Sequence, residues 1–385
     1  MTVFGIGFVA LVPFMAAVPA AAAAPDCPLA RAPYSSRLPV ADIVVDPAAQ
    51  DVLEQVAPEV LEPFSETGRY GRHPTFARIT TPEKLLSALP YGAARTAALD
   101  AALAPIRVTP AASRARCARY DSEPPELPDT IERPSMLVFD KITGFRDAPS
   151  VDAAQAAFER MAQARGWGLF RTDNAAIFNP RDLRRFDVVV WNNVSGDALT
   201  IDQRAAFRSW IEQGGGFAAI HGSAGDPVYF WDWYIDTLIG ARFLEHTGQP
   251  HFQAARVVID DPESWIVRGI GPDWTMTEEW YSFKSNPRTA GAHVLATLDE
   301  TTYDPISRRG EDLRMGDHPI AWTRCVKNGR SFYTAIGHRP ESYVEPHSAI
   351  LLERGIAWAM GIGDTHCRAG REKQGSARGK LDPQR

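Results

Sequence analysis

GGGFAAIHGSAGD, residues 214–226, is the stretch that indicates how the rest of the chain folds. Its glycines lead into the apolar run FAAI, which predicts a buried strand, and this strand ends on His221. Small residues follow, as a tight strand-to-helix turn requires. Because ligands of parallel α/β sheets bind beyond the carboxyl ends of the strands, His221 stands where hydrolases and amidotransferases of this architecture carry their nucleophile. We interpret His221 as functional; the alternative is a core histidine hydrogen-bonded at a strand end.

Strands and helices alternate on the N-terminal side of this stretch. In order, the pattern predicts a strand SMLVFD (135–140), a helix over 150–166, a strand FDVVVWNN (186–193) and a helix over 200–216. The second helix begins with a capping box formed by Thr200 and Gln203. An order of β-α-β-α-β implies a parallel sheet with helices on both faces, so we predict an α/β fold.

The charge of the chain limits the classes of partner. Its 385 residues carry a formal net charge of -6, and its pI is near 5.9. We therefore predict no nucleic-acid interface and no basic membrane-binding face, and expect a small neutral or polar ligand. A homo-oligomer stays open as an alternative.

Composition divides the chain into five segments. The apolar, alanine-rich start predicts a signal peptide and therefore a periplasmic or secreted protein, with no other membrane segment; the alternative is that this start remains as an uncleaved anchor. Helical patterns, a proline-rich stretch and a polar, glycine-rich end mark the other boundaries. The predicted segments are a signal peptide (1–24), a helical module (25–105), an extended linker (106–133), the α/β domain (134–362) and a disordered tail (363–385).

Four cysteines follow the predicted cleavage site, and such residues form disulfides in exported proteins. We favour a pair between Cys27 and Cys117, which would fasten the N-terminal segment. Cys325 and Cys367 could equally be free thiols. No CxxC spacing is present, so a cysteine-based metal site is not expected.

Six motifs in order give the chain a family resemblance. They are GGGFAAIHGSAGD, WDWYIDTLIGARFLEH, TEEWYSF, VLATLDETTY, DHPIAW and GRSFYTAIGHRPESY. Over residues 134–362 the chain resembles the trehalose-utilisation (ThuA-like) family. The resemblance implies the fold of the class I glutamine amidotransferases, a flavodoxin-like three-layer sandwich with a mostly parallel sheet.

The resemblance also implies a change in chemistry. The family is similar to an amidotransferase whose nucleophilic cysteine is replaced by histidine, here His221, so hydrolysis of glutamine by a thiolate is excluded. Its members are associated with the catabolism of disaccharides and modified sugars. Two positions depart from the family pattern: Asp147 stands where a histidine is frequent, and Asp226 follows His221 by five positions instead of four.

We predict three catalytic residues. His221 is the base or nucleophile, Glu279 is its acid-base partner, and His338, at the end of another strand, positions the substrate. For the neighbouring Glu278 we expect a solvated surface position. The candidate substrate-binding residues are Asp226, Trp233, Tyr281, His246 and His318.

No cofactor is predicted with certainty. Several histidines and one carboxylate could bind a divalent metal such as zinc. Because the sequence contains no HxH or HxxxH spacing, such a site would have to be assembled from distant segments.

The leading hypothesis is an exported enzyme of carbohydrate catabolism, of the hydrolase, lyase or isomerase type. Its substrate would be a disaccharide or a keto-sugar derivative. One alternative is a non-catalytic sugar-binding protein on the same fold, and another is that the helical module recruits a protein partner.

Overall fold

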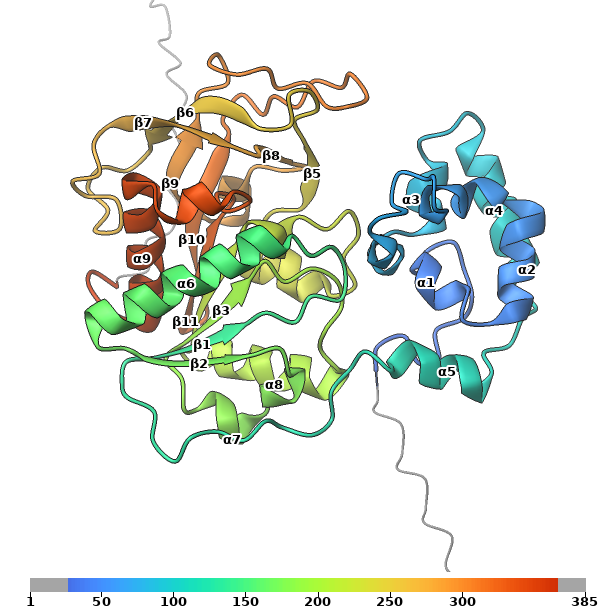
Figure 1. The fold of residues 1–385 in the computed structure, drawn as a ribbon, viewed down its shortest axis with the longest axis horizontal. Coiled ribbons are helices and arrows are strands. Elements are labelled where there is room, and N and C mark those ends of the chain that lie inside the picture. Colours follow the sequence, from blue (N-terminus) through green and yellow to red (C-terminus); the bar gives the residue numbers. More distant parts are fainter. Residues whose placement is uncertain (1–26, 366–385) are drawn as a thin grey trace, which may run out of the picture.

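The computed structural model describes residues 27–365, in which a helical N-terminal part precedes an α/β domain (Figure 1). The predicted signal peptide, residues 1–24, lies outside the described residues, as does Cys367. No helix among residues 27–365 is both long and apolar enough to cross a bilayer.

The N-terminal part is a small helical module with a hydrophobic core of its own. Asp46 and Thr81 cap the second and third helices by accepting hydrogen bonds from backbone N–H groups, as N-cap residues do. The core contains Leu53 of α2 and Leu99 of α4. The helices of the module are α1 (Val40–Ile43), α2 (Pro47–Val56), α3 (Pro82–Leu86), α4 (Gly92–Leu103) and α5 (Pro110–Cys117).

Helix α5 departs from the expected extended linker over 106–133. Pro110 indicates a break in the sequence, but it occupies the first turn of α5, where its missing N–H costs nothing. Thr109 caps the helix by accepting from Ala112 N. The predicted pair of Cys27 and Cys117 is confirmed, and it joins the end of α5 to the start of the module. Cys325 is also disulfide-bonded, so it is not a free thiol.

The N-terminal part contacts the α/β domain through aromatic rings and through hydrogen bonds that include one from Tyr120. Phe145, in the loop after the first strand of the domain, lies 5.0 Å from Phe76 and 5.2 Å from His73 of the module, measured between ring centroids. The Tyr120 hydroxyl donates to Asp197 at 2.8 Å. The module therefore packs on the loop that follows β1.

Within residues 27–365, nine strands form one sheet in the order β2-β1-β3-β4-β11-β10-β9-β6-β7. The first five are parallel, and their order is that of flavodoxin-like folds. The last four are joined by antiparallel pairings. The parallel strands are β1 (Ser135–Phe139), β2 (Gly168–Thr172), β3 (Val188–Asn192), β4 (Gly216–Ile220) and β11 (Gly329–Thr334).

The antiparallel half of the sheet begins with the strand next to β11. Its strands are β10 (Pro319–Val326), β9 (His293–Leu298), β6 (Gln253–Ile259) and β7 (Asp273–Glu278). A separate two-stranded sheet consists of β5 (Phe243–His246) and β8 (Tyr281–Phe283). Glu279 therefore sits in the short turn between β7 of the large sheet and β8 of the small one.

Helices cover both faces of the parallel strands, which confirms the predicted three-layer α/β fold (Figure 1). On one face, Phe207 of α8 packs on Trp191 and Phe217. On the other, Gly355 of α9 lies so close to Phe332 that a Cβ there would clash with the ring. The helices of the domain are α6 (Ala148–Arg165), α7 (Pro180–Leu183), α8 (Ile201–Glu212) and α9 (Pro346–Met360), with a π-helix over Trp233–Ile239.

Candidate functional site

His221 follows β4 directly and lies at the carboxyl edge of the parallel strands. Its φ of 38° is in the left-handed region, which is uncommon for a residue with a Cβ and resembles the strained turn that carries a nucleophile in hydrolases. The turn is held by Asn193, whose Oδ1 accepts from Gly222 N at 3.0 Å, and by Ser223, whose hydroxyl accepts from Val194 N at 3.0 Å.

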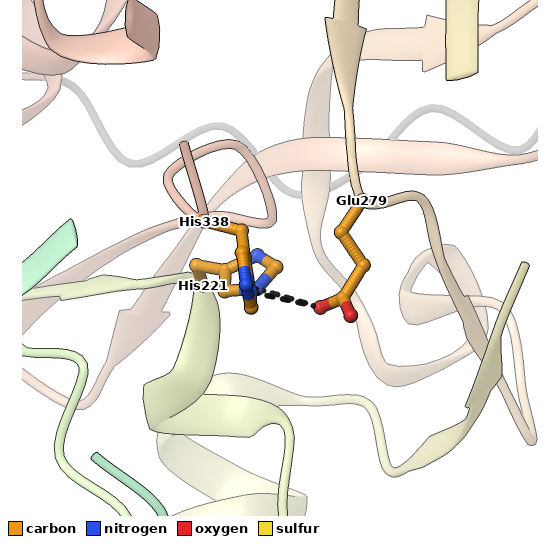
Figure 2. A group of neighbouring side chains, drawn as sticks. All are labelled: His221, Glu279 and His338. Carbon is orange, nitrogen blue, oxygen red and sulfur yellow. Dashed lines mark hydrogen bonds and ion pairs between the residues drawn. The ribbon is translucent and has the colours of Figure 1, made fainter. Parts of the chain in front are cut away.

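Three predicted residues meet at this turn: His221, Glu279 and His338 (Figure 2). The Nε2 atom of His221 lies 3.0 Å from Glu279 Oε2 and 3.1 Å from His338 Nδ1. His338 Nδ1 is 3.2 Å from the same Glu279 oxygen. Side chains that are 58 and 117 positions from His221 in sequence therefore converge on one point.

The other oxygen of Glu279 faces two more histidines. His251 Nε2 is hydrogen-bonded to Oε1, and His246 Nδ1 lies 3.6 Å from it. His246 was predicted to bind substrate, whereas His251 was not predicted at all. It belongs to the loop between β5 and β6, and no periodicity or motif marked it. Glu279 therefore stands between two pairs of imidazoles.

Burial and the hydrogen-bond partners shift the pKa values of Glu279 and His338 in opposite directions. Burial by itself would raise the pKa of Glu279, but its hydrogen bonds with His221, His251 and His338 hold that pKa well below its usual range. Burial would lower the pKa of His338, but the Glu279 carboxylate raises it. The imidazole partners therefore favour the ionised form of Glu279 in a buried position, where a carboxylate requires positive partners or strong donors.

Accessibility differs across the cluster. The side chains of His221 and Glu279 are only 3% and 5% exposed, whereas those of His338 and His251 are 15% and 28% exposed. Phe252 is exposed beside these two histidines, and its ring centroid is 5.3 Å from that of His338 and 4.5 Å from that of His251. A ligand therefore reaches His338, His251 and Phe252 first.

Glu278 is not at the surface, so the expectation of a solvated position was wrong. Its carboxylate is fully buried and accepts hydrogen bonds from Gly337 N at 3.0 Å, Arg339 N at 3.2 Å and the Ser342 hydroxyl. It also accepts from Glu279 N at 2.9 Å. Glu278 thus ties the turn that carries Glu279 to the loop that carries His338.

Two predicted binding residues, Tyr281 and His318, lie behind the ring of His221. The Tyr281 ring stacks on the His221 ring with their centroids 4.1 Å apart. His318 is buried, and its Nε2 lies 2.7 Å from the Tyr281 carbonyl oxygen, while its Nδ1 lies 2.8 Å from Glu300 Oε1. Because it bonds to the backbone of Tyr281, His318 holds Tyr281 in place and does not face the cluster.

Asp226 and Trp233 have other neighbours. Asp226 accepts hydrogen bonds from the Ser195 hydroxyl at 2.6 Å and from Gly196 N at 2.7 Å, and burial raises its pKa to about 7. It lines a small cavity together with Tyr229 and other aromatic residues. Trp233 packs on Trp231 and on the guanidinium of Arg208 in α8. The structure does not bring these two residues to the histidine cluster.

Residues 135–359 match the sequence profile of the family described as trehalose utilisation, ThuA. The chain belongs to the ThuA family. The resemblance carried by the six motifs is therefore confirmed. No curated protein matches the chain.

The chain is similar to solved structures of ThuA-like proteins. One from Bacteroides uniformis is 23% identical, covers 64% of this chain and 98% of its own, and has a TM-score of 0.53. Another from Parabacteroides merdae is 14% identical, covers 60% of this chain and 92% of its own, and has a TM-score of 0.46. In this ThuA chain the helical module lies N-terminal to the matched residues.

Proposed function

We propose that this ThuA chain is an enzyme of carbohydrate catabolism that acts on a disaccharide or a keto-sugar derivative at the cluster around Glu279. The family description supports the link to sugar utilisation. The position of the cluster beyond the carboxyl ends of parallel strands supports a ligand site there. Because His221 stands at the nucleophile position, thiolate chemistry is excluded.

One observation carries the proposal: the buried carboxylate of Glu279 lies within hydrogen-bonding distance of three imidazoles, two of which are partly exposed. Such groups transfer protons and stabilise negative charge on an oxygen, which are the two needs of reactions at a sugar carbonyl or a glycosidic oxygen. His221 is too deeply buried to meet the substrate first, so we assign proton transfer to His251, the more exposed imidazole, and positioning of the substrate to His338.

Phe252 supplies the apolar contact that a sugar ring needs. Its ring is 39% exposed and borders both accessible histidines. The apolar face of a pyranose can pack on an aromatic ring while its hydroxyl groups reach the imidazoles. The proposed substrate therefore lies across Phe252 with a reacting oxygen against the cluster.

The test is a screen of the purified chain against disaccharides and their keto forms, with product analysis by NMR. Conversion should be lost in Glu279→Gln and His251→Ala but kept in His347→Ala, a matched histidine on α9 whose side chain is 38% exposed. If the wild type binds a sugar but never transforms it, the chain is a sugar-binding protein and the enzymatic proposal fails.

We also propose that the protein works outside the cytoplasm. The disulfide between Cys27 and Cys117 supports this, because such bonds persist in oxidising compartments. Cell fractionation with an antibody to the chain tests the proposal, and recovery in the cytoplasmic fraction would refute it.

A further inference from the structure

We infer that His221 Nε2, His338 Nδ1 and Glu279 Oε2 form a binding site for a single divalent transition-metal ion. The proposal goes beyond the proposed function, because it concerns the free protein and can be tested without any sugar. Three features carry it: the tautomer of His221, the spacing of the three atoms, and the groups that hold the ligands from behind.

The tautomer of His221 is fixed by the backbone. Its Nδ1 lies 2.6 Å from the Ala335 carbonyl oxygen, which can only accept a hydrogen bond, so Nδ1 carries the proton. In neutral imidazole the other nitrogen then has a lone pair. In the neutral ring this lone pair on Nε2 is directed toward Glu279 Oε2 at 3.0 Å and His338 Nδ1 at 3.1 Å, so it is available to an ion placed between the three atoms.

The spacing of the three atoms suits an ion. Their separations are 3.0, 3.1 and 3.2 Å. An ion about 2.1 Å from each atom would see them at angles of roughly 95°, close to one face of an octahedron. Two imidazole nitrogens and one carboxylate oxygen on one face form a donor set that binds Fe²⁺ and related ions such as Mn²⁺, Co²⁺ and Zn²⁺.

The groups behind the ligands match those of metal sites. Ligating histidines almost always donate their second N–H to a carbonyl or a carboxylate. His221 donates to the Ala335 carbonyl, and His338 directs its Nε2 toward Asp147 Oδ2 at 3.8 Å. The free oxygen of Glu279 is bonded to His251. His221 and Glu279 are therefore oriented from their far sides by hydrogen bonds, whereas His338 faces a carboxylate beyond hydrogen-bonding distance.

The second group of potential ligands, His246, His251 and Glu279, is a weaker candidate. His246 Nδ1 lies 3.0 Å from the Thr247 carbonyl oxygen, so this nitrogen carries a proton and cannot ligate. His251 is then not a ligand of the ion. On the proposed function, the ion would polarise a substrate oxygen, and His251 would transfer the proton.

The experiment measures ion binding by the full chain. Protein freed of metal by a chelator is titrated with Zn²⁺ and Co²⁺ by calorimetry, and the Co²⁺ complex is followed by its visible absorption. We expect one ion per chain. Glu279→Gln and His338→Ala should weaken binding by at least about 100-fold, whereas His347→Ala should bind as the wild type does.

His338 is the most exposed of the three ligands, so its variant remains informative if His221→Ala does not fold. Circular dichroism establishes that each tested variant is folded. Failure of the wild type to bind an ion, or unchanged binding in both Glu279→Gln and His338→Ala, overturns the inference. A protonated His221 that donates to Glu279 would then account for the contact between the two side chains. Conversion of sugar by a protein that binds no ion would overturn the metal site but keep the proposed function. Binding of an ion without any sugar turnover would do the reverse.

Discussion

Glu278 should determine both the stability of the domain and the position of His338. Replacement by glutamine keeps the size of the side chain but turns one oxygen into an NH₂ group. Either orientation of the amide points this group at two donors: Gly337 N and the Ser342 hydroxyl, or Glu279 N and Arg339 N.

The loss of stability in Glu278→Gln is determined by the amide orientation of lower energy. The Ser342 hydroxyl can rotate and accept from the amide, so the NH₂ group should face Ser342 and leave Gly337 N without a partner. A buried N–H that loses its partner costs about 1–3 kcal/mol. We expect Glu278→Gln to lower the free energy of unfolding by this amount.

The same change should loosen the loop from Gly337 to Ser342 and so displace His338. Turnover should then fall by about 10-fold or more, because small displacements of positioned groups are costly in catalysis. Urea unfolding followed by tryptophan fluorescence gives the stability. The control is Glu341→Gln, whose side chain is 66% exposed and whose loss should cost under about 0.5 kcal/mol. If Glu278→Gln is as stable and as active as this control, the assigned role of Glu278 is wrong.

Three further predictions concern other parts of the chain. Phe252→Ala should raise KM for the sugar about three- to tenfold with little change in kcat, and an unchanged KM would exclude Phe252 from the substrate site. Folding raises the pKa of Asp226 to about 7 from the ordinary 3.8, so its contribution to stability is present at acid pH and lost as pH rises from 4 to 7. Relative to Asp226→Asn, the wild type should lose on the order of 4 kcal/mol over this range in urea unfolding, and parallel curves would contradict the shift. Replacing Cys27 and Cys117 by serine should destabilise the helical module by about 2–4 kcal/mol, measured as faster proteolysis of the module than of the α/β domain; equal rates would count against this.

The parallel half of the fold could be predicted from local sequence. β1, β3 and β4 are continuous apolar runs because helices cover both of their faces, and the capping box at Thr200 is present as expected. The antiparallel half could not be predicted in this way. Its order places β6 between β9 and β7, and these neighbours are determined by contacts across the chain that no local pattern encodes.

The site was predictable in part for a similar reason. His221 and His338 follow strands that end at the same edge of the sheet, so topology brings them together. Glu278 could not be recognised as buried, because its partners lie 59 to 64 positions away in the loop after β11. His251 is similar: only the fold of the β5–β6 loop brings it to Glu279. Trp233 was misplaced because an aromatic residue alone does not show which face it covers.

The contact of Phe145 with Phe76 and His73 has a consequence for how the protein is dissected. Phe145 and Asp147 lie in the same loop, and Asp147 faces His338. A chain shortened to residues 135–359 would therefore lack His73 and Phe76, whose rings pack on this loop. Amino-acid changes far upstream of the α/β domain would therefore alter the support of the loop that places Asp147 beside His338.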